Sequence, residues 1–338
     1  MTLGPILALE TSCDETSAAV VRDGKVLSNI VASQMALHGK WGGVVPEAAA
    51  RAHVEAILPT IEEALLEAAV GLPDLRGIAV TNRPGLIGAL SVGVTAAKAL
   101  SFGLGIPLIG IHHLEGHLCS PLALGEALPF PHICLIVSGG HTELVAVSAL
   151  GEYRLVGETR DDAAGEAFDK GARLLGLGYP GGLAIQQAAV GGDPKRYPLP
   201  QGLTGDTIDF SFSGLKTAVL RLVEREGPSL NVSDAAASLQ EAIIAVLTER
   251  AIRACQQLGA SALTVVGGVA ANLALRDRLS KAALREGIRL LTPPIELCTD
   301  NAAMIGLAAS WRLARGERDG LDLDAYPNAD LPRSSHAA

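Results

Sequence analysis

The stretches PILALETSCDETSAAVV, Pro5 to Val21, and HICLIVSGGHTELVAV, His132 to Val147, decide the fold. Each consists of an apolar run, a short polar turn and a second apolar run, which predicts two strands joined by a hairpin loop. Residues 25–32 and 153–158 are expected to add a third strand to each pair. Because the two units lie about 130 residues apart and helices follow both, we expect a duplicated α/β protein with two lobes and a cleft between them.

Length and composition agree with two lobes. The chain has 338 residues, of which 49% are hydrophobic and 19% are charged, so it can bury a large core. We expect an N-terminal lobe over residues 1–128, a C-terminal lobe over residues 129–325 and a tail over residues 326–338. Residues 334–338 of this tail are expected to be disordered.

Cysteine usage and hydropathy predict a soluble, cytoplasmic protein. The five cysteines are scattered and show no Cys-x-x-Cys spacing, which favours reduced thiols over a disulfide framework. We find no basic segment ahead of an apolar core at the N-terminus, and no run of about 18 uncharged apolar residues. Neither a signal peptide nor membrane association is therefore expected.

The net charge of −9 argues against a protein that grips nucleic acid unaided over a broad surface, because phosphate binding depends on clustered Lys and Arg. A local basic patch remains open. Its candidates are Lys195, Arg196, Lys216, Arg221 and Arg225, and ordinary solvated side chains are the alternative.

The stretch IHHLEGH, residues 111–117, places a histidine cluster after a predicted strand. His113 and His117 are four residues apart, so on a helix they share one face and could bind one metal ion, whereas His112 points elsewhere. A core helix with structural histidines is the alternative. A metal site needs a further ligand, and Asp300, at the start of a later helix, is the acid best placed to supply it, unless it only caps that helix.

Several glycine-rich turns could accept an anion or a nucleoside. The turn Ser138-Gly139-Gly140 leaves backbone amides that can face an anion, although a plain hairpin would look the same. The stretch GGVAAN, residues 267–272, joins a strand to a helix, as in many nucleoside sites, but it is neither a dinucleotide fingerprint nor a Walker loop. Asp169 and Gly182 could face a ligand across a glycine-rich loop.

Seven motifs occur in order between about residues 5 and 315, and together they resemble the tRNA adenosine threonylcarbamoyltransferase family, formerly called the O-sialoglycoprotein endopeptidases. They are ETSCDET (10–16), HLEGH (113–117), VSGGHT (137–142), GEAFDK (165–170), FSFSGLK (210–216), GGVAAN (267–272) and TDN (299–301). The resemblance implies the duplicated ATPase fold of actin and the sugar kinases, which agrees with the repeated unit. One departure is Asn82-Arg83, where many members have Ala-Gly.

The resemblance also implies a site. One divalent metal ion, Fe2+ or Zn2+, would be held by His113, His117 and Asp300. An adenylate would bind to two further groups of residues. Its phosphate and acyl part would be held by Ile136, Val137, Ser138, Gly139 and Gly140. Its nucleoside would be held by Asp169, Gly182 and Asn272.

The implied reaction transfers the threonylcarbamoyl group of threonylcarbamoyl-AMP to the exocyclic amine of the adenosine 3′ of the anticodon, in tRNAs reading ANN codons, and releases AMP. Bacterial members of the family work with an inactive paralogous subunit and a small ATPase, and archaeal and eukaryotic members work in a complex with a kinase. No general base is obvious, and the candidates are Glu10, Asp14 and Glu15.

Three other functions stay open. A metallo-endopeptidase would need a base such as Glu115, but on a helix this side chain points about 200° away from His113. A non-catalytic nucleotide-binding partner subunit is a second alternative, against which the intact set of His113, His117 and Asp300 speaks. A small-molecule kinase of the same superfamily is the third.

Overall fold

The computed structural model describes residues 4–331, which form two compact units. The first contains the chain up to Leu128 together with the residues from Asp300 onward, and the second is Pro129–Thr299. The sequence placed residues 300–325 in the second lobe. The structure differs because helix α10 (Ala302–Ala314), which is buried along most of its length, packs on strands of the first unit.

The sheet of the first unit has the strand order β3-β2-β1-β4-β5. Its strands are β1 (Pro5–Glu10), β2 (Glu15–Arg22), β3 (Lys25–Ser33), β4 (Gly77–Arg83) and β5 (Leu108–His112). The β1–β2 and β2–β3 pairs are antiparallel, and β1, β4 and β5 are parallel. Every residue of β1 is buried, as is typical of a strand that is covered on both faces.

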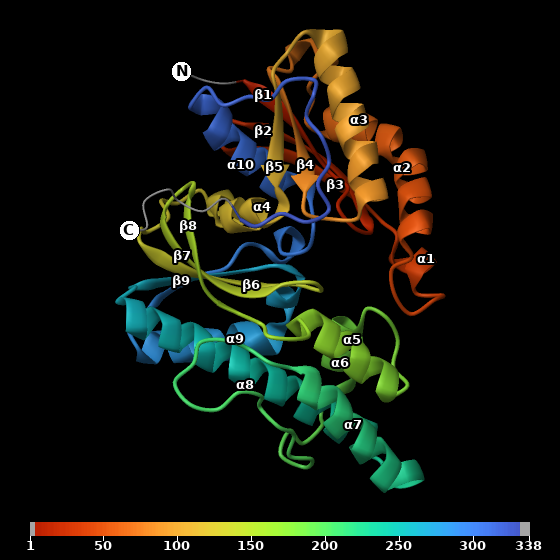
Figure 1. Cartoon of the computed structure of the whole chain (residues 1–338), viewed down its shortest axis with the longest axis vertical. Helices are drawn as coiled ribbons and strands as arrows, with labels where there is room; N and C mark the ends of the chain where they lie inside the picture. The colour runs from red at the N-terminus through yellow and green to blue at the C-terminus, as the bar shows by residue number, and fades with distance from the viewer. Residues whose placement is uncertain (1–3, 332–338) are drawn as a thin grey trace. The chain divides into compact units, whose positions relative to one another are not determined.

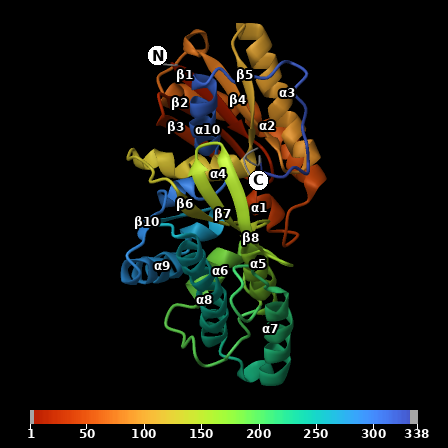
Figure 2. The ribbon, with the colours of Figure 1, turned by 60° about the vertical axis from the view of Figure 1, so that its left-hand side comes forward.

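Helices cover both faces of this sheet (Figures 1 and 2). The helices α2 (Pro46–Glu67) and α3 (Ile87–Leu104) pack against the face to which Leu7 and Leu9 point, and α10 packs against the other. Helix α2 runs as one helix through Pro59. The remaining helical segments of the unit are α1 (Met35–His38), η1 (Leu72–Asp74), α4 (His113–Cys119) and η2 (Ser120–Leu124).

Helix α3 is, within residues 4–331, the one helix long and apolar enough to cross a membrane by length and composition. It packs on β4 and α2 through buried residues that include Leu90 and Val94. Because packed core helices meet the same two criteria, this finding is weak evidence for a membrane span.

The second unit repeats the topology of the first, since its sheet has the order β10-β9-β6-β7-β8. The strands are β6 (His132–Val137), β7 (Thr142–Ala149), β8 (Glu152–Glu158), β9 (Ala262–Val266) and β10 (Arg289–Leu291). Again the first three pair antiparallel, and β6, β9 and β10 pair parallel. The duplication predicted from the two hairpin stretches is therefore confirmed.

The helices of the second unit lie together in both views and share one apolar core with β6 and β9 (Figures 1 and 2). They are α5 (Ala164–Leu174), α6 (Gly181–Ala188), α7 (Ser213–Glu226), α8 (Val232–Leu258) and α9 (Leu273–Arg285), with the short segments η3 (Gly227–Ser229), η4 (Gly268–Ala271) and η5 (Ile295–Leu297). The long helix α8 contacts β6, β9 and α9 and forms the centre of this core.

The segment after α10 returns to the first sheet. Asn82 donates through Nδ2 to the Asp324 carbonyl oxygen at 3.0 Å, and its own carbonyl oxygen accepts from the Tyr326 amide at 2.8 Å. Asn82, the first residue of the Asn82-Arg83 departure from the family pattern, therefore anchors this segment. Of the predicted tail, residues 326–331 are described and begin at this anchor, while residues 332–338, which include the stretch predicted to be disordered, lie outside the described residues.

Candidate functional site

Helix α4 starts where β5 ends, and the histidine cluster runs from its N-cap, His112, to His117 in its last turn. His112 is the N-cap, because its Nδ1 accepts from the Leu114 amide at 3.2 Å, while its Nε2 lies 3.2 Å from the Ala329 carbonyl oxygen. His113 and His117 follow one turn apart on one face, with ring centroids 4.8 Å apart and planes at 87°. The two imidazoles therefore share one face of the helix, as the spacing predicted, and they meet edge to face, while His112 takes a separate role.

Asp300 joins these two histidines. Its Oδ1 lies 3.5 Å from Nε2 of His113 and 3.2 Å from Nε2 of His117. The cap of α10 is the next residue, Asn301, whose side chain accepts from the Met304 amide at 3.1 Å. Asp300 is therefore not the helix cap. One donor atom from each of the three residues lies within 4.8 Å of the others, so His113, His117 and Asp300 could hold one metal ion.

Glu10, at the end of β1, stands behind His113. Its Oε2 lies 3.1 Å from Nδ1 of His113 and accepts from the Thr81 hydroxyl at 2.5 Å, and its Oε1 accepts from the Ser12 amide at 2.6 Å. The side chain is fully buried. A carboxylate on Nδ1 fixes the ring and leaves Nε2 as the donor toward a metal. Sequence reasoning considered Glu10 only as a base and missed this orienting role.

The charges of this group are strongly coupled. Burial opposes protonation of His113, but the carboxylates of Asp300 and Glu10 outweigh it and hold the pKa of His113 well above its usual value. Burial also works against ionised Asp300, yet His113 and His117 hold the pKa of Asp300 well below the usual range. Burial lowers the pKa of His117, so this ring is neutral, the form that binds metals.

The donor set fits a divalent transition metal. Two imidazole nitrogens and one carboxylate oxygen are ligands that Zn2+ and Fe2+ accept, and three protein ligands leave a position open for a substrate. The buried carboxylate of Glu10 and the partly exposed carboxylate of Asp300 both lie against the His113 imidazole, so two negative charges come close together and a cation would balance them. Both observations support a metal centre on the first unit.

The other two candidate bases are Asp14, which lies in the β1–β2 turn, and Glu15, which is the first residue of β2. Burial raises the pKa of Asp14 and raises that of Glu15 to about 7, although Ser33 donates to Glu15 Oε1 at 2.9 Å. A carboxyl group that titrates near neutral pH can accept a proton under working conditions. Glu15 is therefore better suited to act as a base than Glu10, because both carboxylate oxygens of Glu10 already accept hydrogen bonds.

On the second unit, the β6–β7 turn exposes the predicted phosphate loop. The Ser138 amide donates to the His141 carbonyl oxygen at 2.8 Å, and the Ser138 hydroxyl accepts from the His141 amide at 3.1 Å. A Cβ at Gly139 or Gly140 would meet nothing within 4 Å. The backbone here is therefore open to a ligand. Ile136 and Val137 are fully buried in β6 and lie under the loop, so they support it through the strand.

The three residues predicted to hold the nucleoside lie in two separate hydrogen-bond networks. Asp169 accepts through Oδ1 from the Gly181 amide at 2.7 Å, next to Gly182, where a Cβ would meet nothing within 4 Å. Asn272 caps α9, because its Oδ1 accepts from the Leu275 amide at 3.0 Å, and its Nδ2 donates to Gln240 Oε1 at 2.9 Å. Asp169 and Gly182 therefore lie together, and Asn272 is already engaged in capping its helix.

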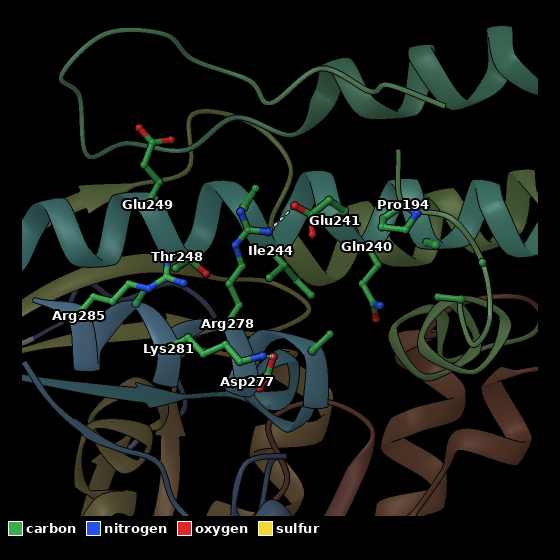
Figure 3. A pocket seen from close by; sticks show the side chains of 16 residues that line it. Pro194, Gln240, Glu241, Ile244, Thr248, Glu249, Asp277, Arg278, Lys281 and Arg285 are labelled. Atoms are coloured by element: carbon green, nitrogen blue, oxygen red, sulfur yellow. Dashed lines mark hydrogen bonds and ion pairs between the residues drawn. The ribbon is translucent and has the colours of Figure 1, made fainter. Parts of the chain in front are cut away.

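A hollow of about 630 Å³ lies elsewhere on the second unit, between α8 and α9 (Figure 3). None of the residues predicted from the sequence lines it. Arg278 pairs with Glu241, and Lys281 pairs with Asp277 at 2.6 Å, so its charges largely cancel. This hollow has no charge imbalance that would select an anionic ligand.

We predict that the loop at Ser138 depends on the absence of a side chain at Gly165. A Cβ there would lie 2.6 Å from the Ser138 carbonyl oxygen and 2.8 Å from the Gly139 Cα, both of which are backbone atoms. Gly165→Ala is expected to cost about 1–3 kcal/mol of unfolding free energy and to weaken AMP binding. Gly139→Ala, at an open position, should leave the unfolding free energy within about 0.5 kcal/mol. Denaturant titration and AMP calorimetry compare the two, and equal stabilities would contradict the prediction.

Fold and site together define the class of protein. Two units of one topology, three side chains on the first that could hold a metal ion, and an open glycine turn on the second indicate an enzyme with a two-lobed ATPase-like fold. The chain is similar in structure to the phosphate- and nucleotide-bound form of full-length HypF, with a TM-score of 0.61 and 12% identity over 94% of this chain and 47% of that one. It is also similar to the activator of 2-hydroxyisocaproyl-CoA dehydratase from Clostridium difficile, with a TM-score of 0.52 and 11% identity over 94% and 99%.

Sequence comparison then gives the family. The TsaD profile, described as tRNA N6-adenosine threonylcarbamoyltransferase, matches residues 25–307. Enzymes with that description from Anaeromyxobacter dehalogenans (strain 2CP-C) and Symbiobacterium thermophilum are 54% and 53% identical, over 95% and 97% of this chain and 98% and 97% of theirs. The chain belongs to the tRNA N6-adenosine threonylcarbamoyltransferase family and is a transferase that modifies tRNA.

Proposed function

We propose that the transfer of the threonylcarbamoyl group depends on one divalent metal ion, Fe2+ or Zn2+, held by His113, His117 and Asp300. The observation that carries this proposal is the approach of the partly exposed Asp300 to two buried imidazoles, with Glu10 on the far nitrogen of His113. The resemblance named both iron and zinc, and the nitrogen and oxygen donors suit either metal.

The donor, threonylcarbamoyl-AMP, is proposed to lie on the turn Ser138-Gly139-Gly140, with its nucleoside near Asp169, Gly182 and Asn272. The open backbone at Gly139 and Gly140 supports this, since amides without a neighbouring side chain can approach a phosphate closely. A mixed carbamoyl–phosphate anhydride already has a good leaving group. The enzyme therefore has mainly to align the amine and stabilise charge on the carbonyl and phosphate.

The bound metal ion would supply a Lewis acid for a carbonyl or phosphoryl oxygen. The chain's own residues do the rest in this proposal. Glu10 holds His113 in the tautomer that presents Nε2, and the turn after β6 binds and orients the phosphate. Of the three candidate carboxyl groups, Glu15 is best suited to take the proton from the attacking amine, because its pKa is raised to about 7.

The acceptor is proposed to be the exocyclic amine of the adenosine 3′ of the anticodon in tRNAs reading ANN codons, in the cytoplasm. The test supplies the purified chain, its partner proteins, pre-made threonylcarbamoyl-AMP and unmodified tRNA, and measures modified nucleoside by mass spectrometry. Modified nucleoside and released AMP in equal amounts are expected. Intact donor and unmodified tRNA after incubation with all partners would contradict the proposal.

The contacts of Glu115 speak against the metallo-endopeptidase alternative. A protease of that kind needs a free base beside the metal-bound water. Glu115 is fully buried and bound to Arg312, with nitrogen-to-oxygen distances of 2.8–3.0 Å. We therefore expect no casein cleavage under conditions in which the chain modifies tRNA.

A partner surface is proposed on α2. If the chain is bacterial, its partners are expected to be a paralogous subunit and a small ATPase. Val54 and Leu58 are one turn apart on α2, and each is 63% exposed, so two apolar side chains lie next to each other on the surface of this helix. Contiguous exposed apolar surface is a feature of protein interfaces.

We predict that Leu58→Asp weakens binding of the paralogous subunit at least about tenfold, because a charge would be buried in an apolar contact. Leu284→Asp is the control, since Leu284 is 81% exposed on α9 of the other unit and its substitution should not alter binding. Calorimetry with the purified paralogue measures both variants. Equal affinities for the two would exclude this surface.

A further inference from the structure

The central acid of the HLEGH motif lies in an ion pair away from the histidines. Glu115 is fully buried, and its two carboxylate oxygens accept from Nε and Nη2 of Arg312, each at 3.0 Å. Because Glu115 follows His113 by two residues on a helix, it points about 200° away from it. The ion pair with Arg312 therefore lies on the face of α4 opposite to the two imidazoles.

Helix α10 contacts the histidine helix α4 at more than one level. The residue before its cap, Asp300, approaches His113 and His117. One turn further along, a Cβ at Gly116 would lie 2.7 Å from Cδ1 of Ile305, so the helices touch closely there. Near the end of α10, Arg312 binds Glu115. One helix thus brings the aspartate to the histidines and also holds the helix on which they lie.

A helix as short as α4 depends on contacts with its neighbours to fix its orientation. Helix α4 has seven residues, too few to fix its own orientation through internal hydrogen bonds. At Gly116 the two helices meet through apolar packing alone, and a rotation of α4 about its axis would move both imidazoles. A guanidinium bound through two nitrogens to one carboxylate is directional in a way that a packing contact or a lysine is not.

We propose that the Arg312–Glu115 pair is a positioning device for the metal centre, which fixes the rotation of α4 so that His113 and His117 both face Asp300. This inference rests on the proposed metal site. Arg312 and Glu115 are positioning residues that act through the histidines. Arg312 also pairs with Glu317 at 2.8 Å, which orients its guanidinium from the other side.

The test is a Co2+ titration of the full-length, metal-free chain, followed by the visible absorption of the bound ion. Arg312→Lys keeps the charge and loses the two-nitrogen contact. The matched control is Arg160→Lys in the second unit, because Arg160 also binds a carboxylate, that of Asp209, through Nε and Nη2 and is 59% exposed. The double variant Glu115→Leu/Arg312→Met removes both partners together and leaves no unpaired buried charge, so it keeps the test valid if the single variant fails to fold.

We expect Arg312→Lys and the double variant to bind Co2+ about 10–100-fold more weakly than the native chain, the usual effect of losing a group that orients a ligand, and to show an altered absorption band. Arg160→Lys should keep the native affinity and band. Folded Arg312 variants with native affinity and band would overturn the positioning role alone. A native chain that modifies tRNA but binds no Co2+ would overturn the metal site and this inference with it.

Discussion

Asp300→Asn lowers the rate of threonylcarbamoyl transfer by about a thousandfold or more, whereas the fold is retained. The substitution keeps the size of the side chain and removes the charge that lies 3.2 Å from His117 Nε2 and 3.5 Å from His113 Nε2. A Lewis acid stabilises the charge of a transition state by several kcal/mol, and each 1.4 kcal/mol of lost stabilisation lowers the rate about tenfold. The rate is measured with saturating donor, tRNA and partners.

The control for Asp300→Asn is Asp277→Asn, which makes the same change at an exposed pair with Lys281. Its transfer rate should match that of the native chain. Circular dichroism of Asp300→Asn should also match the native spectrum, because Asn301 and not Asp300 caps α10. Transfer by Asp300→Asn within about tenfold of the native rate would show that the metal centre does not drive the reaction.

Glu10→Gln is expected to weaken metal binding by about 10–100-fold and to lower the transfer rate at limiting metal. An amide has one carbonyl oxygen for the contacts that Glu10 now makes with Ser12, Thr81 and His113, and it lacks the charge that stabilises a cation nearby. Of the contacts to His113 Nδ1, the weaker one with the Ser12 hydroxyl at 3.2 Å then remains, and it does not fix the tautomer, because a hydroxyl can donate or accept. Competition with a chromogenic chelator measures the affinity.

Thr81→Val serves as the graded comparison for Glu10→Gln. It removes the 2.5 Å hydrogen bond from the Thr81 hydroxyl to Glu10 but keeps the carboxylate, so its effect on metal affinity should be clearly smaller. If Glu10→Gln binds metal as tightly as the native chain, Glu10 does not orient His113, and its burial needs another explanation.

Much of this fold could be predicted because its signals are local. Two apolar–polar–apolar stretches predicted the hairpins of both units, and the i, i+4 spacing of His113 and His117 placed their rings on one face. The assignment of α10 was different. Its sequence is apolar all round, which predicts burial but does not say against which sheet, and so residues 300–325 were placed with the wrong unit.

The supporting residues of the site could not be predicted, because they depend on contacts between distant parts of the chain. Glu10 reaches His113 over 103 positions, and Arg312 reaches Glu115 over 197. Neither contact leaves a periodicity or a spacing in the sequence. What the sequence did indicate was that Glu115 points away from the histidines, and the structure supplies the partner that it points toward.

The central claim is that His113, His117 and Asp300 hold one metal ion, and anomalous X-ray scattering from crystals of the purified chain tests it most directly. The account predicts a single strong anomalous peak at the absorption edge of iron or zinc, in contact with an imidazole nitrogen of each histidine and a carboxylate oxygen of Asp300. The peak should vanish in crystals of Asp300→Asn. A metal peak bound elsewhere, or none in crystals of enzyme that modifies tRNA, would contradict the claim.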